Sequence, residues 1–387
     1  MKVALSGGHL TPALAVIHAF RRISPKTKLV FIGREFAQTK ELTRSRERQE
    51  MKKLRIPFYP INAAKFHRTY FLRNFEELFR LFPSFKESYD ILKNEKPDVF
   101  ISFGGYLAVP IAIVARSLGI PVITHEQTRT TGLANQLIAY FAKKIAISHD
   151  HSRKYFPKNK TVLTGNPVRP AFMELFRKKP EWLADVPINK PFVYITGGSQ
   201  GSHILNKTIC MLLPQLTTQM IVVHQCGASV GGENARELEE ARATLPAAQQ
   251  RRYVIREWVS EKDVAWLFQH ADLIIARSGA NTVHEIMVSK VPAIFIPLPF
   301  AHMNEQHKNA QLLAENGAAV ILPQQELVPK TLYETIRSCL KRGEMMQRRA
   351  EELDSTVVVD AADKIVALAK ELYDDTIKTA QSQSDKH

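Results

Sequence analysis

The stretch Leu273–Ala310 reads LIIARSGANTVHEIMVSKVPAIFIPLPFAHMNEQHKNA and decides the fold. Its first four residues are apolar and predict a buried strand that stops at Ser278-Gly279. Apolar residues then recur at helical spacing, so a helix should begin just after the glycine. A second strand is predicted over Ala293–Pro297, and another helix should start near Asn304. The stretch therefore predicts two successive strand-turn-helix units of a parallel α/β sheet.

This arrangement indicates a binding site for an anion. Helix N-termini that meet at the carboxyl edge of a parallel sheet present free N–H groups and positive dipole ends. Glu285, in the first of these helices, can accept hydrogen bonds from sugar hydroxyls. The combination suggests a nucleotide diphosphate with a ribose, although an ordinary strand-turn-helix with a capping serine has the same pattern.

The same plan recurs near the start of each half of the chain. Val3–Leu5 is a predicted strand followed by the turn Ser6-Gly7-Gly8-His9, and Phe192–Ile195 is followed by TGGSQG at positions 196–201. Glycine lets the backbone approach a ligand closely, because no side chain stands in the way. Each turn alone could be a plain connection. The pair predicts two doubly wound α/β domains that face each other.

Polar residues follow further predicted strands in the first half. Val99–Phe103 ends in Gly104-Gly105-Tyr106, and Pro121–Thr124 ends in His125-Glu126-Gln127. Doubly wound folds place their sites at this edge. A turn-rich segment at Thr164–Arg169 predicts the domain boundary, and helices are expected over Pro329–Leu340 and Met345–Leu372.

Composition limits the class of protein. The chain has 387 residues, of which 45% are hydrophobic and 24% charged, as expected for globular domains with full-sized cores. No run approaches the ~20 apolar residues of a membrane span, and no signal peptide is recognised, so a cytoplasmic protein is expected. The three cysteines are odd in number and widely spaced, which favours reduced thiols. The formal charge of +15 calls for an anionic partner.

One segment does not fit a plain α/β pattern. Residues 65–91 read KFHRTYFLRNFEELFRLFPSFKESYDI, with aromatic rings interleaved with basic side chains. This composition is typical of a surface that dips into anionic lipid headgroups. Alternatively, Phe71, Phe75, Phe79 and Phe82 pack on the sheet as a core stripe. Nucleic-acid binding is not favoured, because no recognisable motif accompanies the aromatic residues.

Eight motifs, in order, resemble those of the MurG family of bacterial cell-wall glycosyltransferases. They are SGGHLTP, FGGY, HEQ, GLAN, GNPVR, GGSQGS, RSGANTVHEI and NEQHKNA, and they span roughly residues 3 to 325. This family transfers N-acetylglucosamine (GlcNAc) from UDP-GlcNAc to lipid I, the polyprenyl-linked muramyl-pentapeptide. The resemblance implies a role in peptidoglycan synthesis, and through it in cell shape and division.

The resemblance also implies the architecture. The fold would be α/β of the GT-B type, with two facing doubly wound Rossmann-like domains and an interdomain cleft. Residues 1–163 would form an acceptor-binding, membrane-associating domain and residues 164–345 a UDP-sugar-binding domain. Residues 346–374 would form a helical segment that packs back on the first domain, and residues 375–387 a polar tail.

Matching motifs carry the family's site onto this chain. The implied UDP-GlcNAc contacts are Ser6, Gly7, Gly8, Asn135, Arg169, Ser199, Val259, Ala280, Asn281, Thr282, Val283, His284, Glu285 and Gln306. The implied acceptor and membrane residues are Gly104, Gly105, Tyr106, Phe71, Phe75, Phe79, Phe82, Arg73 and Arg80. Within the donor set, Glu285 would bind the ribose, the helix start at Ala280–Thr282 the diphosphate, and Arg169 would compensate charge.

Transfer needs a base for the acceptor hydroxyl, and His9 is the first candidate because an imidazole exchanges protons near neutrality. Glu126 is the alternative base, and its other role would be to brace the GLAN loop. The family's reaction inverts the anomeric centre and uses no metal ion or cofactor. The chain departs from the family at Thr128, where an asparagine is usual, and at Ala4-Leu5, where glycines are usual.

The expected partners are UDP-GlcNAc, lipid I, an anionic membrane surface and other cell-wall assembly enzymes, without nucleic acid. The protein would act as a peripheral protein on the cytoplasmic face of the plasma membrane, the inner membrane of the cell. Three alternatives stay open: a GT-B enzyme with another acceptor, a UDP-GlcNAc 2-epimerase-like enzyme, and a non-catalytic nucleotide-sugar-binding scaffold. An NAD dehydrogenase is disfavoured, because neither glycine turn is a GxGxxG motif.

Overall fold

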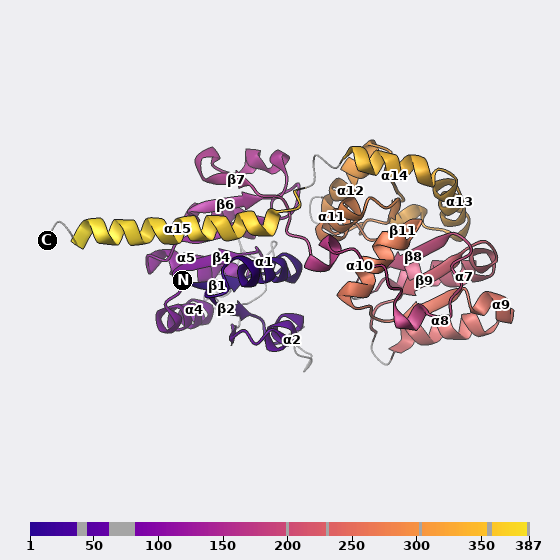
Figure 1. Ribbon diagram of the computed structural model, residues 1–387, viewed down its shortest axis with the longest axis horizontal. Helices are drawn as coiled ribbons and strands as arrows, with labels where there is room; N and C mark the ends of the chain where they lie inside the picture. Colours follow the sequence, from indigo (N-terminus) through magenta and orange to yellow (C-terminus); the bar gives the residue numbers. More distant parts are fainter. Residues whose placement is uncertain are drawn as a thin grey trace, which may run out of the picture. The chain divides into compact units, whose positions relative to one another are not determined.

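The computed structural model describes residues 1–36, 45–61, 82–198, 201–229, 232–301, 304–353 and 358–384. The chain forms two compact units (Figure 1). Unit 1 comprises residues 1–169 and 358–387, and unit 2 comprises residues 170–357. Each unit is a parallel sheet covered by helices, as the strand and turn patterns predict.

Unit 1 contains a seven-stranded sheet in the order β3-β2-β1-β4-β5-β6-β7. Its strands are β1 (Lys2–Ser6), β2 (Lys28–Gly33), β3 (Phe58–Pro60), β4 (Val99–Ser102), β5 (Val122–Glu126), β6 (Lys144–Ile147) and β7 (Thr161–Leu163). Its helices are α1 (Leu10–Ile23), α2 (Arg46–Lys53), α4 (Phe82–Glu95), α5 (Ala108–Ser117), α6 (Leu133–Phe141) and α15 (Ala361–Ser384), with 3-10 turns at Asp150–Tyr155 and Lys158–Lys160.

Unit 2 contains a six-stranded sheet in the order β10-β9-β8-β11-β12-β13. Its strands are β8 (Phe192–Thr196), β9 (Ile221–Gln225), β10 (Tyr253–Arg256), β11 (Leu273–Ala276), β12 (Ala293–Phe295) and β13 (Ala319–Ile321). Its helices are α7 (His203–Gln219), α8 (Glu233–Ala243), α9 (Ala247–Gln250), α10 (Glu261–His270), α11 (Ala280–Ser289), α12 (Glu305–Glu315), α13 (Pro329–Lys341) and α14 (Gly343–Glu352), with 3-10 turns at Pro170–Met173, Glu181–Leu183 and Gln324–Glu326.

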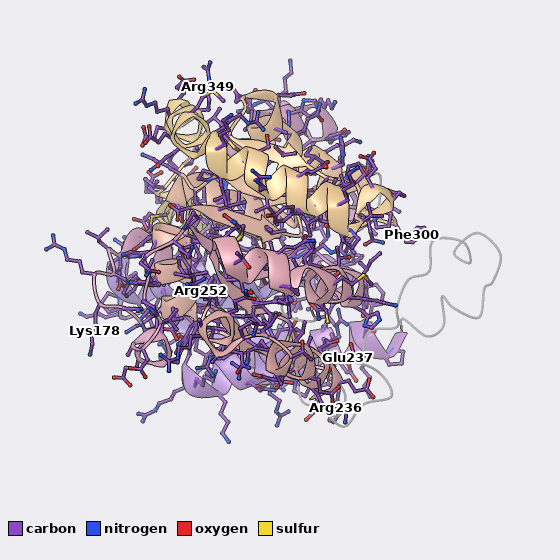
Figure 2. All side chains as sticks on the ribbon, turned by 90° about the vertical axis from the view of Figure 1, so that its right-hand side faces the viewer. Lys178, Arg236, Glu237, Arg252, Phe300 and Arg349 are labelled. Carbon is purple, nitrogen blue, oxygen red and sulfur yellow. The ribbon has the colours of Figure 1, made fainter. Side chains whose placement is uncertain are left out.

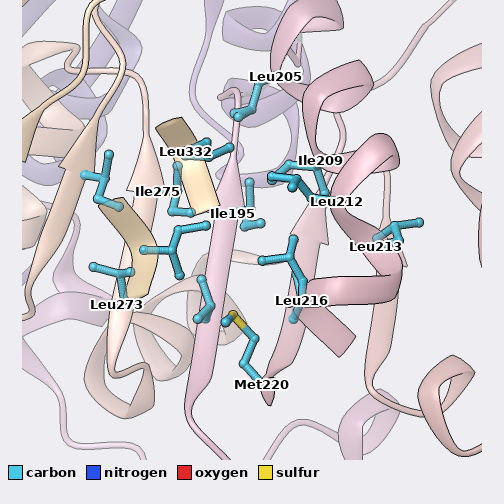
Figure 3. Packing of buried hydrophobic residues seen from close by; sticks show 14 of the residues in the cluster. Ile195, Leu205, Ile209, Leu212, Leu213, Leu216, Met220, Leu273, Ile275 and Leu332 are labelled. Carbon is cyan, nitrogen blue, oxygen red and sulfur yellow. The ribbon is translucent and has the colours of Figure 1, made fainter. Parts of the chain in front are cut away.

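Alternating side chains on the strands build a core on each face of a sheet. In unit 1, Val3 and Leu5 pack with α1 and α15, whereas Ala4 packs with α5 and α6 on the other face. In unit 2, Ile195 and Ile275 pack against the leucine-rich side of α7 (Figure 3). Burial on both faces explains why these strands read as continuous apolar runs.

The order of the strands reverses at one point in each sheet. In unit 1 the chain moves outward from β1 to β2 and β3, then returns to place β4 on the other side of β1. Unit 2 repeats this path around β8, with β11 on the returning side. Ligands of doubly wound folds bind beyond the carboxyl ends of the strands at this switch point. The two glycine turns predicted from the sequence follow β1 and β8.

The prediction of one helix over Met345–Leu372 was wrong. The structure has two helices there, α14, which ends at Glu352, and α15, which begins at Ala361. The chain leaves unit 2 after α14, and α15 packs against α1 in unit 1 (Figure 1). A straight helix cannot pack on two separate cores, so the break belongs to the change of unit. Residues 375–384, predicted as a polar tail, continue α15 to Ser384.

The contacts also divide the chain six residues beyond the predicted boundary at 163/164. The turn after β7 stays with unit 1, because the Thr164 and Gly165 N–H groups donate to the Ile147 carbonyl. Val358 also packs closely on Gly165. Turn-forming residues mark a bend in the chain, and hydrogen bonds decide to which side the bend belongs.

Helix α15 should be part of the folding unit of residues 1–169. Ile365 is fully buried in the core that α15 shares with α1 and β1. We expect Ile365→Ala to lower the free energy of unfolding by about 2–5 kcal/mol, because it leaves a cavity there. Chemical denaturation measures the change. Lys370→Ala, at an exposed position of the same helix, is the control and should have little effect.

Candidate functional site

Two loops interlock at the switch point of unit 1. The Gly8 N–H donates to the Gly104 carbonyl at 2.9 Å. A Cβ at Gly7 would lie 2.7 Å from the Cβ of Phe103, which is closer than real side chains come. Only glycine therefore fits at position 7 without displacing the loop after β4. The structure thus brings the predicted turn Ser6–His9 and the predicted loop Gly104–Tyr106 together.

A buried polar atom at this point has no protein partner. Ser6, the last residue of β1, is fully buried, and its hydroxyl makes no hydrogen bond with the described residues. Leaving a buried hydroxyl unsatisfied costs about 1–3 kcal/mol. Ser278 has the same property at the end of β11, at the switch point of unit 2. Such atoms favour a site that a ligand or water completes.

The Glu126 carboxylate ties together the loop between β5 and α6. Glu126 Oε1 accepts from the Thr128 N–H at 3.0 Å and from the Thr128 hydroxyl at 2.7 Å. Its Oε2 accepts from the Gly132 N–H at 3.2 Å and from Asn135 Nδ2 at 2.9 Å. Four donors to one buried carboxylate favour the bracing role over that of a base. Thr128, which replaces the family's usual asparagine, supplies two of them.

Asn135 is also engaged within unit 1. Its Oδ1 accepts from the Thr124 hydroxyl at 3.0 Å, and its Nδ2 also donates to the His125 carbonyl at 3.1 Å. A Cβ at Gly104 would lie only 3.0 Å from Nδ2. The amide therefore holds α6, β5 and the Gly104 loop in place. Through these contacts it fixes the shape of the site.

His125 is buried and neutral. Its Nε2 lies 3.1 Å from the Gly165 carbonyl oxygen and 3.1 Å from Ser148 Oγ. Because a carbonyl only accepts, Nε2 carries the hydrogen in the first of these contacts. Burial lowers the pKa of His125 to about 4. The hydrogen bond to the Gly165 carbonyl raises this pKa slightly, and repulsion between the protonated rings of His125 and His9 would lower it slightly. His125 and Glu126 are the last two residues of β5, so the strand runs two residues further than predicted.

His9 occupies the N-cap position of α1 and makes no side-chain cap. The residue is exposed at the surface, yet the protein atoms packed around its ring desolvate it and lower its pKa to about 4. Both facts describe an imidazole that is neutral at pH 7 and reachable from solvent. A neutral imidazole can accept a proton.

The helices that leave the carboxyl edge of unit 2 keep their first N–H groups free of side-chain caps. None of α7, α11 and α12 has a capping hydrogen bond from the side chain at its N-cap. These helices follow three adjacent strands, β8, β11 and β12. In the same unit Ser260 caps α10, whereas α8 and α13 also lack a side-chain cap, so the position of α7, α11 and α12 beside the switch point is what distinguishes these three. The edge next to the switch point therefore presents three helix N-termini suited to an anion.

Arg277 explains why α7 has no cap, and the sequence did not reveal it. Arg277 Nη2 donates to the hydroxyl of Ser202, the N-cap residue of α7, at 2.7 Å and to Gln324 Oε1 at 2.8 Å. Its Nη1 donates to the Ile296 carbonyl at 3.0 Å. The guanidinium thus ties the ends of β11 and β12 to the start of α7. A charged residue directly after an apolar strand was the available signal.

The predicted donor residues of unit 2 lie along α11 and in the loops beside it. Ala280, Asn281 and Thr282 are partly accessible in its first turn, whereas Val283, His284 and Glu285 are buried. Gln306 Oε1 accepts from the Leu298 N–H at 3.0 Å, and Asn309 Nδ2 donates to the Ser278 carbonyl at 3.2 Å. Phe300 lies between β12 and α12 and is 96% exposed (Figure 2). The sequence analysis did not single it out.

The remaining predicted residues are distributed as follows. Val259 is buried just before α10, Arg169 is the last residue of unit 1, and Tyr106 lies under the Arg34 guanidinium, 5.1 Å from the ring centre. Ser199 lies outside the described residues, as do Phe71, Phe75, Phe79, Arg73 and Arg80; Phe82 begins α4. Among the described helices, none has the length and apolar character to cross a membrane.

The predicted residues therefore form two groups, one at the carboxyl edge of each sheet. The group in unit 1 has two glycine turns, an accessible neutral imidazole and a braced loop. The group in unit 2 has three helix N-termini and a buried carboxylate, and its chemistry suits a diphosphate and sugar hydroxyls. Within the described ranges, no three His, Cys, Asp or Glu side chains gather as a metal site would require.

The sequence of this chain is similar to those of known proteins. Residues 6–147 match the glycosyltransferase family 28 N-terminal domain, and residues 192–365 match the C-terminal domain of that family. The chain is 30% identical to a protein of Acetivibrio thermocellus over 96% of this chain and 98% of that protein. It is 34% identical to one of Clostridium botulinum over 87% of this chain and 88% of the relative. Both relatives are named UDP-N-acetylglucosamine--N-acetylmuramyl-(pentapeptide) pyrophosphoryl-undecaprenol N-acetylglucosamine transferase.

Solved structures of similar fold include another member of this family. MurG of Acinetobacter baumannii is 26% identical and superposes with a TM-score of 0.69 over 96% of this chain and 99% of that one. A UDP-GlcNAc 2-epimerase of Neisseria meningitidis has a TM-score of 0.65 at 14% identity, covering 95% and 99% of the two chains, and shares the fold alone. The protein is therefore a glycosyltransferase with the GT-B fold, and it belongs to the MurG family of N-acetylglucosamine transferases.

Proposed function

We propose that this chain transfers GlcNAc from UDP-GlcNAc to lipid I, the undecaprenyl-pyrophosphoryl muramyl-pentapeptide, and so forms lipid II. The names of the relatives support this reaction. The observation that carries the proposal is the set of three uncapped helix N-termini at the switch point of unit 2. Their N–H groups suit the diphosphate of the donor, whereas unit 1 offers the neutral imidazole that an acceptor hydroxyl needs.

In the proposed complex, unit 2 binds the donor. The first turn of α11, at Ala280–Thr282, would donate N–H groups to the diphosphate, and Arg169 would offset its charge. Glu285 would accept from the ribose hydroxyls. Gln306 uses its Oε1 on the backbone of Leu298, which leaves its Nε2 hydrogens for the sugar. The backbone at Val259 would contact UDP-GlcNAc, as the family resemblance implies.

The assignment of Glu285 can be tested by UDP binding. We expect Glu285→Ala to weaken UDP binding by about tenfold to a hundredfold, because hydrogen bonds to a charged group are worth about 1.5–3 kcal/mol. Isothermal titration calorimetry measures the affinity. Glu315→Ala, at an exposed position of the neighbouring helix α12, is the matched control. Wild-type affinity in a folded Glu285→Ala protein would remove Glu285 from the site.

The proposed chemistry is a single displacement that inverts the anomeric carbon. The acceptor hydroxyl oxygen attacks that carbon while its bond to the diphosphate oxygen breaks and UDP leaves with the bonding electrons. The hydroxyl proton passes to the neutral ring of His9. Backbone N–H groups of α11 stabilise the charge that develops on the departing diphosphate. The proposed mechanism uses no metal ion.

Replacing His9 should remove the base. We expect His9→Ala to lower kcat by about 10²–10⁴-fold with little change in UDP affinity. The wild-type enzyme should keep its activity as the pH falls through about 6.5 and lose it only as the pH approaches about 4, because burial lowers the pKa of His9 to about that value and the ring stays neutral above it. Steady-state rates between pH 3 and 8 measure this acid limb. The limb should be missing in His9→Ala.

Glu126→Gln provides the contrast in this experiment. If Glu126 braces the loop, the variant unfolds more easily but keeps the acid limb of the pH profile. If Glu126 were the base, the variant would stay as stable as wild type and lose both turnover and the limb. A stable, inactive Glu126→Gln protein beside an active His9→Ala protein would move the role to Glu126.

We further propose that the protein works as a peripheral protein on the cytoplasmic face of the plasma membrane and there contributes to cell-wall assembly, cell shape and division. The acceptor is a polyprenyl lipid, so the site must reach a bilayer. The aromatic and basic composition of residues 65–91 supports this location, as does the charge of +15. Most of this segment lies outside the described residues.

A transfer assay decides among the candidate functions. We expect the purified protein to convert UDP-GlcNAc and a short-chain lipid I analogue into the GlcNAc-bearing product in the presence of a chelator, as followed by mass spectrometry. The MurG of a characterised relative serves as the active control. Production of a 2-epimer of UDP-GlcNAc would favour the epimerase alternative. No product beside an active control would reject the proposed transfer.

A further inference from the structure

We propose that Arg34 binds the pyrophosphate group of the acceptor at the carboxyl edge of unit 1. The inference deepens the proposed function and rests on it, because transfer to an acceptor of another kind would need no pyrophosphate site there. The sequence analysis did not single out Arg34. Its position in the sheet and its unused hydrogen-bond donors support this role.

Arg34 and Tyr106 meet across the end of β1. Arg34 follows directly after β2, and Tyr106 lies in the loop between β4 and α5. β2 and β4 are the two neighbours of β1 in the sheet. The Arg34 guanidinium lies 5.1 Å from the centre of the Tyr106 ring, as in a cation–π contact. Because the two residues come from opposite sides of β1, the pair spans its carboxyl end, where the turn that leads to His9 begins.

This pair presents hydrogen-bond donors that the described residues do not use. Within the described ranges, the Arg34 guanidinium forms no ion pair and the Tyr106 hydroxyl makes no hydrogen bond. Both residues are partly exposed, so a ligand can reach them. Burial raises the pKa of Tyr106, so its hydroxyl keeps its proton at neutral pH and remains a donor.

The neighbouring carboxylates leave the guanidinium unpaired. Glu47 Oε2 accepts from the backbone N–H of Arg34 at 3.1 Å, so Glu47 fixes the main chain rather than the side chain. Burial raises the pKa of Glu47, which favours its uncharged form, and the Arg34 N–H and charge oppose this shift in part. Glu35 pairs with Arg48 at 2.5 Å. Of these four side chains, Arg34 is therefore the one whose charge is left for a ligand.

The surroundings of Arg34 favour a phosphate group as this ligand. A guanidinium donates two parallel N–H bonds to a phosphate. The Ser6 hydroxyl at the end of β1 is fully buried and has no partner among the described residues, and α1 begins after the same turn without a side-chain cap. A helix N-terminus of this kind stabilises an anion. The proposed acceptor carries its pyrophosphate next to the muramyl sugar, so a pyrophosphate bound here would hold that sugar at this edge.

Binding of a prenyl pyrophosphate tests the proposal without requiring transfer. The probe is geranyl pyrophosphate, titrated by calorimetry into the full chain while UDP saturates the donor site. We expect Arg34→Met to weaken binding by about tenfold to a hundredfold, because it removes charge-assisted hydrogen bonds. Arg116→Met, at the exposed far end of α5, is the matched control and should bind as wild type. Glu47→Gln keeps an acceptor oxygen for the Arg34 N–H and should bind the probe at least as tightly as wild type.

Steady-state kinetics add a readout that a merely structural role would not move. In Arg34→Met the KM for the lipid I analogue should rise by about the same factor as the probe affinity falls. The KM for UDP-GlcNAc and the midpoint of thermal unfolding should stay close to the wild-type values. The methyl glycoside of muramyl-pentapeptide has the peptide carboxylates but no pyrophosphate, so it should bind equally to both proteins.

Three results would overturn the proposal. They are wild-type affinity for the probe in a folded Arg34→Met protein, no saturable binding of the probe to wild type, and weaker binding of the methyl glycoside in Arg34→Met, which would assign Arg34 to a peptide carboxylate. Failure of the proposed function is a separate outcome. If wild type transferred no GlcNAc but bound the probe through Arg34, the proposed transfer would be rejected and the pyrophosphate site would remain.

Discussion

The proposed donor site depends on backbone N–H groups at helix N-termini that have no hydrogen-bond partner within their own helix. Every helix leaves its first N–H groups without intrahelical partners, and proteins usually cap them with a side chain. Here α7, α11 and α12 lack such caps beside the switch point of unit 2, as do α8 and α13, whereas α10 has one. Arg277 contributes to this difference, because it takes the Ser202 hydroxyl that could have capped α7. The free donors make this edge suitable for a diphosphate.

Unit 1 carries the proposed base, which must be accessible to the acceptor and also fixed in position. The loop that follows β5 is held by the Glu126 carboxylate and by Asn135, so neither group is spare for chemistry. The turn after β1 is held by the Gly8–Gly104 hydrogen bond and by the close approach of Gly7 to Phe103. His9 is the titratable residue among these that is exposed, and its neutral form suits proton transfer. Rigid surroundings reduce the reorganisation that the reaction requires.

Membership of the MurG family does not account for every feature of the chain. A groove of about 410 Å³ lies beside β10 and shares no lining residue with the proposed donor site. Natural proteins often protect a sheet edge with charged residues. The charges that line this groove are of both signs, because Asp185 and Glu239 lie beside Arg242, Arg251 and Arg256.

The sequence by itself determined the fold class, the two glycine turns, the strand-turn-helix units around Gly279 and the family. These features are local, because an apolar run, a glycine and a helical repeat each act within about ten residues. The tertiary structure decided what Glu126 and Asn135 do, since their partners come from several elements packed around the same loop. It also decided that Arg277 serves three elements and that the last helices separate into α14 and α15. Four β-branched residues in succession at positions 356–359 were the available signal for this break, because such residues are weak helix formers.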